Sequence, residues 1–230
     1  MQLQQISTYI DLLIRWNARI NLTGIRDPDE IVTRHFGESL FLARHLFGCV
    51  ERAPSPAWPY ASSQTQKMEE EMLGPSYPET ARASLAGEGA RPTQAITTVL
   101  DIGSGAGFPG LPLKIWAPGI SLTMIESNHK KAAFLREAVR ALTLTDVNVT
   151  TARAETLLDT HDIVTLRAVE RFDTILPTAA SLLAPAGRLA LLIGSSQLSN
   201  LETLTPDLRW SPPIPVPQSH SRMLSISIPL

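Results

Sequence analysis

The apolar positions of the chain form a helical pattern first and a mixed strand-and-helix pattern later. Between Ile6 and Ile20, apolar side chains recur at steps of three and four residues, as in an amphipathic helix. Residues 27–30 supply an N-cap acid, a proline at the first helical position and a glutamate three residues after the cap. They predict a second helix to about Leu46. From Thr97 onward, apolar runs alternate with helical stretches, which predicts an α/β fold with a mostly parallel sheet and helices on both faces.

The alternating part divides into individual elements. Strands are expected at residues 99–101, 120–126, 147–151, 162–166, 188–193 and 223–228. Helices are expected from residue 111, at 128–142 with Asn128 as the N-cap, and at 171–183. Residues 51–95 follow neither pattern, because they are rich in Pro, Ser, Ala and Glu without lasting periodicity. We therefore expect an N-terminal helical unit (1–50), an insertion or linker (51–95) and an α/β domain (96–230).

The stretch after the first strand of this domain is rich in glycine. An apolar run ends in Asp101, glycines follow at 103, 105 and 107, and Phe108-Pro109-Gly110 leads into a helix. Strand, glycine loop and helix in this order are typical of a nucleotide-cofactor loop. Glycines allow positive φ and a close approach of the ligand to the backbone. We expect the cofactor-binding residues of this stretch to be Asp101, Gly103, Gly105, Gly107 and Phe108.

The spacing of these glycines favours one cofactor. A dinucleotide site has the pattern G-x-G-x-x-G and aims a helix N-terminus at a pyrophosphate. This chain has G-x-G-x-G, and Phe108-Pro109 stands where a phosphate would need N–H donors, which proline does not offer. The pattern therefore predicts S-adenosylmethionine, a nucleoside without phosphates. The alternatives are a tight turn without a ligand and a nicotinamide-dependent oxidoreductase.

Three later strand ends supply further candidates. Glu126 lies about 20 residues beyond the glycine loop, where a carboxylate accepts hydrogen bonds from ribose hydroxyls. Ala154 and Glu155 follow the third strand and are expected beside the adenine; the alternative for Glu155 is a solvated surface acid. Arg167 ends the fourth strand, where it serves either as an ion-pair partner or, as its position favours, in binding.

Two interpretations of the N-terminal helical unit stay open. In the first, the unit is a lid that packs on the α/β domain, and Arg34 and Glu38 form a surface pair at four-residue spacing. In the second, polar residues of the unit face a substrate, namely Asn21, Thr23, His35 and Ser39.

Composition and charge restrict the setting. The single cysteine, Cys49, excludes internal disulfides and Cys-x-x-Cys metal or redox sites, so we expect no metal and a reducing, cytoplasmic environment. No uncharged run reaches the roughly 18 residues of a membrane span, so no membrane association is expected. The net charge of −2 does not favour RNA binding. However, residues 51–95 hold four basic and six acidic residues, which leaves the rest neutral and allows a local basic face.

Four segments together resemble one family, the GidB/RsmG family of bacterial methyltransferases. These segments, in order, are Asn21-Leu22-Thr23, His35-Phe36-Gly37-Glu38-Ser39-Leu40, residues 101–110 and Arg167-Ala168. The family methylates guanine N7 in the decoding-region loop of 16S ribosomal RNA. The resemblance covers nearly all of the chain except 51–95. It implies a Rossmann-like class I S-adenosylmethionine-dependent methyltransferase, with 16S rRNA or the small ribosomal subunit as partner; a monomer is expected.

The resemblance also implies roles for single residues. Gly103, Phe108, Ala154, Glu155 and Arg167 match cofactor-contacting positions of the family. The residues expected to line the guanine entrance, as the catalytic set, are His35, Ser39 and Arg167.

The chain departs from the family pattern in three places. The family usually has Asp where this chain has Glu38, carries a lysine after the fifth strand where this chain has Ile193-Gly194, and lacks the insertion at 51–95.

The chemistry implied by the resemblance requires little of the protein. Guanine N7 carries an in-plane lone pair and needs no general base, so catalysis depends on in-line positioning and on contacts to the base, which we expect from Arg167 or a donor of the helical unit. A methyltransferase with another substrate and a cofactor-binding ribosome-assembly factor without activity remain alternatives.

Overall fold

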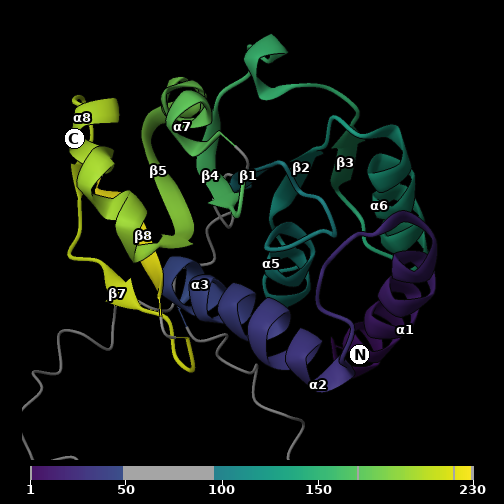
Figure 1. The fold of residues 1–230 in the computed structure, drawn as a ribbon. Helices are drawn as coiled ribbons and strands as arrows, with labels where there is room; N and C mark the ends of the chain where they lie inside the picture. Colours follow the sequence, from purple (N-terminus) through teal and green to yellow (C-terminus); the bar gives the residue numbers. More distant parts are fainter. Residues whose placement is uncertain (1, 49–95, 170, 220, 229–230) are drawn as a thin grey trace, which may run out of the picture. The chain divides into compact units, whose positions relative to one another are not determined.

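The structure is a computed structural model that describes residues 2–48, 96–169, 171–219 and 221–228 (Figure 1). The insertion or linker expected at residues 51–95 lies outside the described residues. The chain segments before and after it belong to one compact unit. Within the described segments, no helix is long and apolar enough to cross a membrane.

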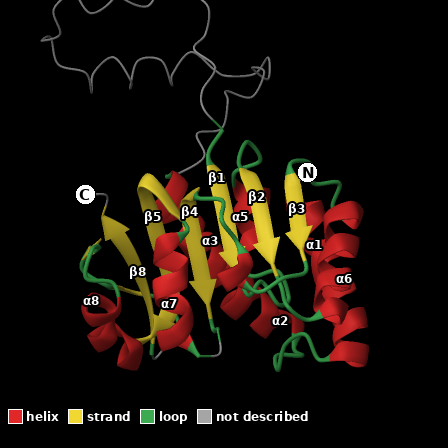
Figure 2. Cartoon of the chain, turned by 90° about the horizontal axis from the view of Figure 1, so that it is seen from above, coloured by secondary structure: helices red, strands yellow, loops and turns green. Residues whose placement is uncertain are grey.

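A mixed sheet forms the centre of this unit. Its path is β3-β2-β1-β4-β5-β8-β6, and Figure 2 shows the longer strands side by side. Five strands run parallel: β1 (Thr98–Ile102), β2 (Ser121–Ile125), β3 (Val147–Thr150), β4 (His161–Arg167) and β5 (Leu183–Gly194). The antiparallel strands are β8 (Arg222–Ile228), β6 (Arg209–Trp210) and β7 (Ile214–Pro215). The predicted, mostly parallel sheet is therefore confirmed, and its order reverses between β1 and β4.

The helices of the α/β part follow the strands with one exception. They are α5 (Gly110–Trp116), α6 (His129–Ala141), α7 (Phe172–Ser181) and α8 (Leu201–Leu204), with a 3₁₀ segment η5 (Ser195–Asn200) before α8. Asn128 caps α6, as predicted, by accepting hydrogen bonds from the N–H groups of Lys130 and Lys131. Between β3 and β4 the chain forms only a 3₁₀ turn, η4 (Ala154–Thr156). This short connection carries no apolar repeat that a helix could bury.

Alternation along the strands divides the core into two layers. Val99 and Leu122 face α5, α6 and the N-terminal helices, whereas Leu100 and Val164 face α7. The sheet is thus covered on both faces, as predicted.

The N-terminal unit consists of two helical runs. The first, α1 (Gln2–Ile20), lies beside α6, and the second contains α2 (Pro28–Glu30), η1 (Ile31–Phe36) and α3 (Gly37–Phe47), with α3 beside α5 (Figure 1). Asp27 caps the second run as predicted, through its side chain and the N–H groups of Asp29 and Glu30. The π-helical geometry of η1 was not predicted, because a single wide turn leaves no distinct spacing in the sequence.

The predicted surface pair between Arg34 and Glu38 is wrong. Glu38 is buried and its carboxylate instead pairs with Arg167 on β4, which lies 129 residues further along the chain. The helix turns Glu38 toward the sheet because the residues one turn before and one turn after it, His35 and Leu42, are buried.

Candidate active site

A cavity of about 500 Å³ opens at the carboxyl ends of β1 and β4, where the strand order reverses. Ligands of open α/β sheets bind at such a switch point. The cavity walls come from the glycine loop, the end of β2, η4, the end of β4 and the N-terminal unit. Its volume is typical of sites for small molecules and cofactors.

The glycine loop forms one wall and depends on its glycines for its shape. Gly103, Gly105 and Gly107 have φ values of +69°, +55° and +90°, a region that other residues rarely adopt. Gly103 and Gly105 line the cavity. Gly107 does not; a Cβ there would collide with the Tyr9 hydroxyl and lie 2.6 Å from Leu111 Cδ1. The small size of Gly107 therefore serves packing against α1, and its predicted contact with the cofactor stays a prediction without support from the cavity lining.

Asp101 lies beneath the loop rather than in the cavity. It is buried, its Oδ1 accepts a hydrogen bond from Thr165 Oγ1 at 2.9 Å, and its Oδ2 accepts one from Gly110 N at 3.3 Å. Burial raises the pKa of Asp101 from 3.8 to about 6. The cavity lining thus does not include Asp101, and its carboxylate holds the start of α5 under the loop. Its predicted role in cofactor binding stays a prediction.

Glu126 reaches the cavity from the end of β2, at the predicted place. Its Oε2 accepts a hydrogen bond from Gly105 N at 2.9 Å, and its Oε1 accepts one from Asn128 N at 2.7 Å. Each carboxylate oxygen has a second lone pair, so Glu126 can accept two more hydrogen bonds from neighbouring hydroxyls. Ala154 and Glu155 also line the cavity, from η4.

Phe108 joins the glycine loop to the N-terminal unit. Its ring lies between Tyr9 and His35, with centroid distances of 5.2 and 4.7 Å, and both neighbours are stacked on it. The Tyr9 hydroxyl donates a hydrogen bond to the carbonyl oxygen of Ala106, and burial raises the pKa of Tyr9, which keeps this donor protonated. The N-terminal unit is therefore both a packing partner of the loop and a wall of the cavity, which combines the two interpretations of it.

Arg167 lines the cavity from the end of β4 and forms a buried ion pair. Its Nε and Nη2 donate hydrogen bonds to Oε2 of Glu38 at 3.0 and 2.9 Å, and Nη2 also contacts Nδ1 of His35 at 2.9 Å. Burial lowers the pKa of Arg167, and the charge of Glu38 opposes this shift. Nη1 has no hydrogen-bond partner within the described segments. One end of the guanidinium is thus free to donate to a ligand.

His35 is held in one tautomer by its two neighbours. An arginine only donates, so Nδ1 of His35 must accept from Arg167 and Nε2 carries the proton that is donated to Thr23 Oγ1 at 2.8 Å. Burial lowers the pKa of His35 to about 3, and the charge of Arg167 adds to the shift. The imidazole is therefore neutral near pH 7, and both nitrogens already have partners. This side chain orients Arg167 and is not poised to accept a proton.

The structure does not bring Ser39 to the cavity. Its hydroxyl is fully buried and donates a hydrogen bond to the carbonyl oxygen of His35 at 2.7 Å, one turn earlier in the helix. The prediction that Ser39 lines the entrance is corrected accordingly.

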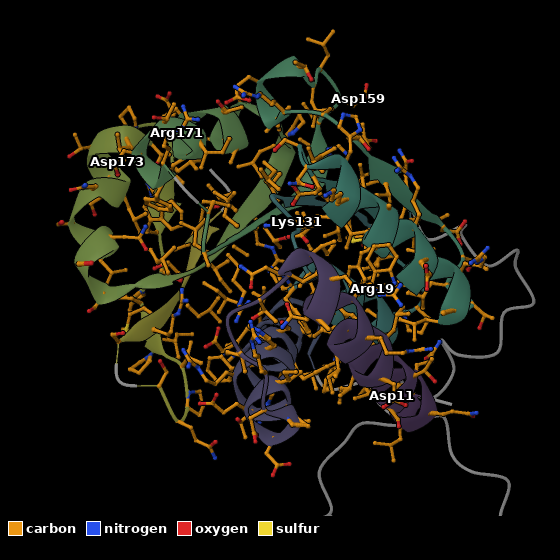
Figure 3. All side chains as sticks on the ribbon, turned by 45° about the vertical axis from the view of Figure 1, so that its right-hand side comes forward. Asp11, Arg19, Lys131, Asp159, Arg171 and Asp173 are labelled. Carbon is orange, nitrogen blue, oxygen red and sulfur yellow. The ribbon has the colours of Figure 1, made fainter. Side chains whose placement is uncertain are left out.

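Several cavity residues were not predicted, because isolated polar residues at element ends carry no pattern of their own. They are Asn128, Lys131, Arg153, Arg171 and Thr174. Figure 3 labels Lys131 on α6 and Arg171 just before α7. The family lysine after the fifth strand has no equivalent at Gly194, but Arg222 of β8 is paired with Gly194 in the sheet. The charge of Arg222 contributes to the lowered pKa of His35.

The sequence of this chain is similar to those of curated proteins. Two curated relatives are both named ribosomal RNA small subunit methyltransferase G. The protein of Xylella fastidiosa (strain 9a5c) is 32% identical over 200 residues, and that of Roseiflexus castenholzii is 37% identical over 201 residues. The alignments cover 86% and 85% of this chain, which spans 72% and 66% of the length of these relatives.

A solved structure supports the fold. The mitomycin 7-O-methyltransferase MmcR is 21% identical, with a TM-score of 0.50 over 58% of this chain and 49% of that one. The expected Rossmann-like class I methyltransferase fold is confirmed. The sequence profile of the GidB family, described as rRNA small subunit methyltransferase G, matches residues 2–50 and 86–214. As predicted, the chain belongs to the GidB family.

Proposed function

We propose that this protein transfers the methyl group of S-adenosylmethionine to guanine N7 in the decoding-region loop of 16S rRNA. The observation that carries the proposal is the joining of two halves in one cavity. The glycine loop with Glu126 forms one half, and Arg167 with His35 forms the other. Membership of the GidB family supports the same reaction.

The first half of the cavity fits the cofactor. Glu126 has free lone pairs for the two ribose hydroxyls, and Ala154 and Glu155, which line the same cavity from η4, are the proposed neighbours of the adenine. Phe108-Pro109 offers no N–H row for a pyrophosphate, because proline lacks a donor. When bound, S-adenosylmethionine supplies an electrophilic methyl group on a sulfonium. Gly103 and Gly105 let the loop backbone approach it closely.

The second half of the cavity suits an acceptor that needs no deprotonation. The lone pair of guanine N7 forms the new N–CH₃ bond while the C–S bond breaks and its electron pair remains on sulfur. No proton leaves, which agrees with a neutral His35 whose nitrogens are both engaged. The proposed donor to guanine O6 is Nη1 of Arg167, which has no hydrogen-bond partner within the described segments. Such a contact would hold the base in line with the methyl group.

Other parts of the expected setting depend on this proposal. The cytoplasmic location follows from the ribosomal substrate and stays a prediction, as does the monomeric state. Methylation assays with free 16S rRNA and with the small subunit as substrate distinguish which of the two is the acceptor.

Mapping of methylated nucleotides tests the proposal. Small subunits from cells with and without the protein are compared, and a single N7-methylguanine that depends on the protein is expected in the decoding-region loop. In vitro, Arg167→Ala is expected to lower turnover at least 100-fold, whereas Arg140→Ala, at an exposed position on α6, retains it. Thermal melting checks that both variants fold. Unchanged turnover of folded Arg167→Ala contradicts the role of Arg167, and the absence of any methylated guanine contradicts the proposed reaction.

A further inference from the structure

A groove lies next to the cavity of the candidate active site, where the end of α1 meets the start of α6. Its volume is about 590 Å³, and its lining comes from the last turn of α1, the loop after it and the first residues of α6. The lining residues are Asn17, Ala18, Arg19, Ile20, Asn21, Arg26, Asn128 and Lys130. Figure 3 labels Arg19 on α1, and Lys131, the neighbour of Lys130, on α6.

The charged side chains of this groove are all cationic. Arg19, Arg26 and Lys130 are exposed, and none of them forms an ion pair or a side-chain hydrogen bond with any described residue. The remaining polar lining consists of asparagines. A cluster of unpaired cations on a chain whose net charge is −2 repels itself and is suited to an anionic partner.

The acids closest along the chain do not neutralise the groove. Asp27, Asp29 and Glu30 follow Arg26, but none of them lines the groove. Asp27 directs its carboxylate at the N–H groups that begin α2. The only ion pair within the described residues, between Arg167 and Glu38, lies in the neighbouring cavity.

The groove adjoins the cavity. Asn128 lines both, and the loop after α1 contributes Asn21 to the groove and Thr23 to the cavity. Asn17 lines the groove and fixes this loop, since its side chain bonds the backbone N–H of Thr23 and the carbonyl oxygen of Thr23, each at 2.9 Å. A polyanion lying in the groove therefore passes directly beside the entrance that Thr23 and His35 form.

We infer that this groove binds the phosphate backbone of the RNA that carries the acceptor guanine, with Arg19, Arg26 and Lys130 as the phosphate contacts. The inference rests on the proposed function. The groove positions the strand that flanks the target base, whereas Arg167 contacts the base itself. Phosphate contacts of this kind set register and affinity without reading sequence.

The test compares two triple variants of the full chain for binding to 16S rRNA transcribed in vitro, over a series of salt concentrations. The groove variant is Arg19→Gln/Arg26→Gln/Lys130→Gln. The matched control, Arg44→Gln/Arg140→Gln/Arg209→Gln, removes the same charge from exposed arginines that line neither the groove nor the cavity. Calorimetry with S-adenosylhomocysteine verifies that the cofactor half is intact, and both variants are expected to bind it like the wild type.

In the groove variant the slope of log K against log salt concentration is expected to be smaller in magnitude by about 2–3, since each of the three lost phosphate contacts removes roughly 0.7–0.9. Its RNA affinity at about 0.15 M salt should fall at least tenfold. The control should keep the wild-type slope. Equal losses in both variants, no loss in the groove variant, or wild-type binding that is independent of salt would overturn the inference.

Methyl transfer by the wild type separates this inference from the proposed function. If the wild type binds 16S rRNA through the groove but transfers no methyl group, the phosphate surface stands and the reaction fails. If the wild type methylates 16S rRNA and the groove variant behaves like the control, the reaction stands and the surface is overturned.

Discussion

Replacing Thr23 with valine tests how the entrance of the cavity is held together. Thr23→Val keeps the shape of the side chain and removes Oγ1, the acceptor for the Nε2–H group of His35. Both neutral tautomers of the His35 imidazole are then unfavourable. It can keep its proton at Nε2 without a partner, or move it to Nδ1, where it faces the donor of Arg167.

The magnitude follows from the burial of these groups. A buried donor left without a partner costs about 1–3 kcal/mol, which corresponds to a factor of roughly 5–150 in an equilibrium or a rate. The Ile25 N–H group also loses its bond to Oγ1, but it is part-buried and can be solvated. We therefore expect turnover to fall about tenfold or more, while the affinity for S-adenosylhomocysteine, which binds the other half of the cavity, stays within about twofold.

Two assays check this expectation. Steady-state kinetics with 16S rRNA separate kcat from KM, and nitrogen chemical shifts of His35 report the tautomer independently of activity. Thr23→Ser restores the acceptor and should restore both the Nε2–H tautomer and turnover. Wild-type kinetics together with an unchanged tautomer in Thr23→Val would refute the assignment of Thr23 as the residue that orients His35.

Three further predictions concern the loop and its support. Gly107→Ala should lower the free energy of unfolding, measured by urea denaturation, by about 2–4 kcal/mol, because the Cβ clashes with Tyr9 and alanine is strained at positive φ. Gly24→Ala is the control, since the space around Gly24 is open. Asp101 has a raised pKa, so it binds a proton more tightly in the native state, and its contribution to stability falls by about 3 kcal/mol as the pH rises from about 4 to above 6. Subtracting the pH profile of Asp101→Asn from that of the wild type isolates this fall, and a difference that does not change with pH would contradict it. Glu126→Gln should weaken S-adenosylhomocysteine binding by about 10–100-fold in calorimetry, because the substitution removes an ionised acceptor. Binding of 16S rRNA should be retained. Equal affinity of the variant and the wild type for S-adenosylhomocysteine would exclude Glu126 from the cofactor half.

The sequence predicted those parts of the fold that local spacing determines. The cap at Asn128, the glycine turn and the order of strands and helices each have a short pattern with one physical cause, and the structure agrees with them. The end of the fourth strand already indicated a binding role for Arg167, and His35 was one of several polar candidates of the helical unit. The family resemblance added their place at the guanine entrance. Their position on the cavity wall agrees with the expectation, and their roles stay predictions.

Contacts between distant segments could not be predicted in the same way. Glu38 has an arginine four residues earlier, yet it pairs with Arg167, because burial on the sheet side favours the partner that is buried with it. Asp101 and Ser39 were expected at the ligand, since both stand in family-like motifs. The structure shows that a motif residue can instead support its neighbours from beneath, through Gly110 in one case and the His35 carbonyl in the other.

The stacking of Phe108 between Tyr9 and His35 has a consequence for how such chains can be shortened or recombined. A fragment that began at Ile96 would keep every strand of the sheet but would leave an aromatic ring bare at the mouth of the cavity. A graft of helices from another protein would have to bring matching rings at both positions. The three aromatic residues therefore pack as one unit, and the amino-terminal segment cannot be exchanged independently of the glycine loop.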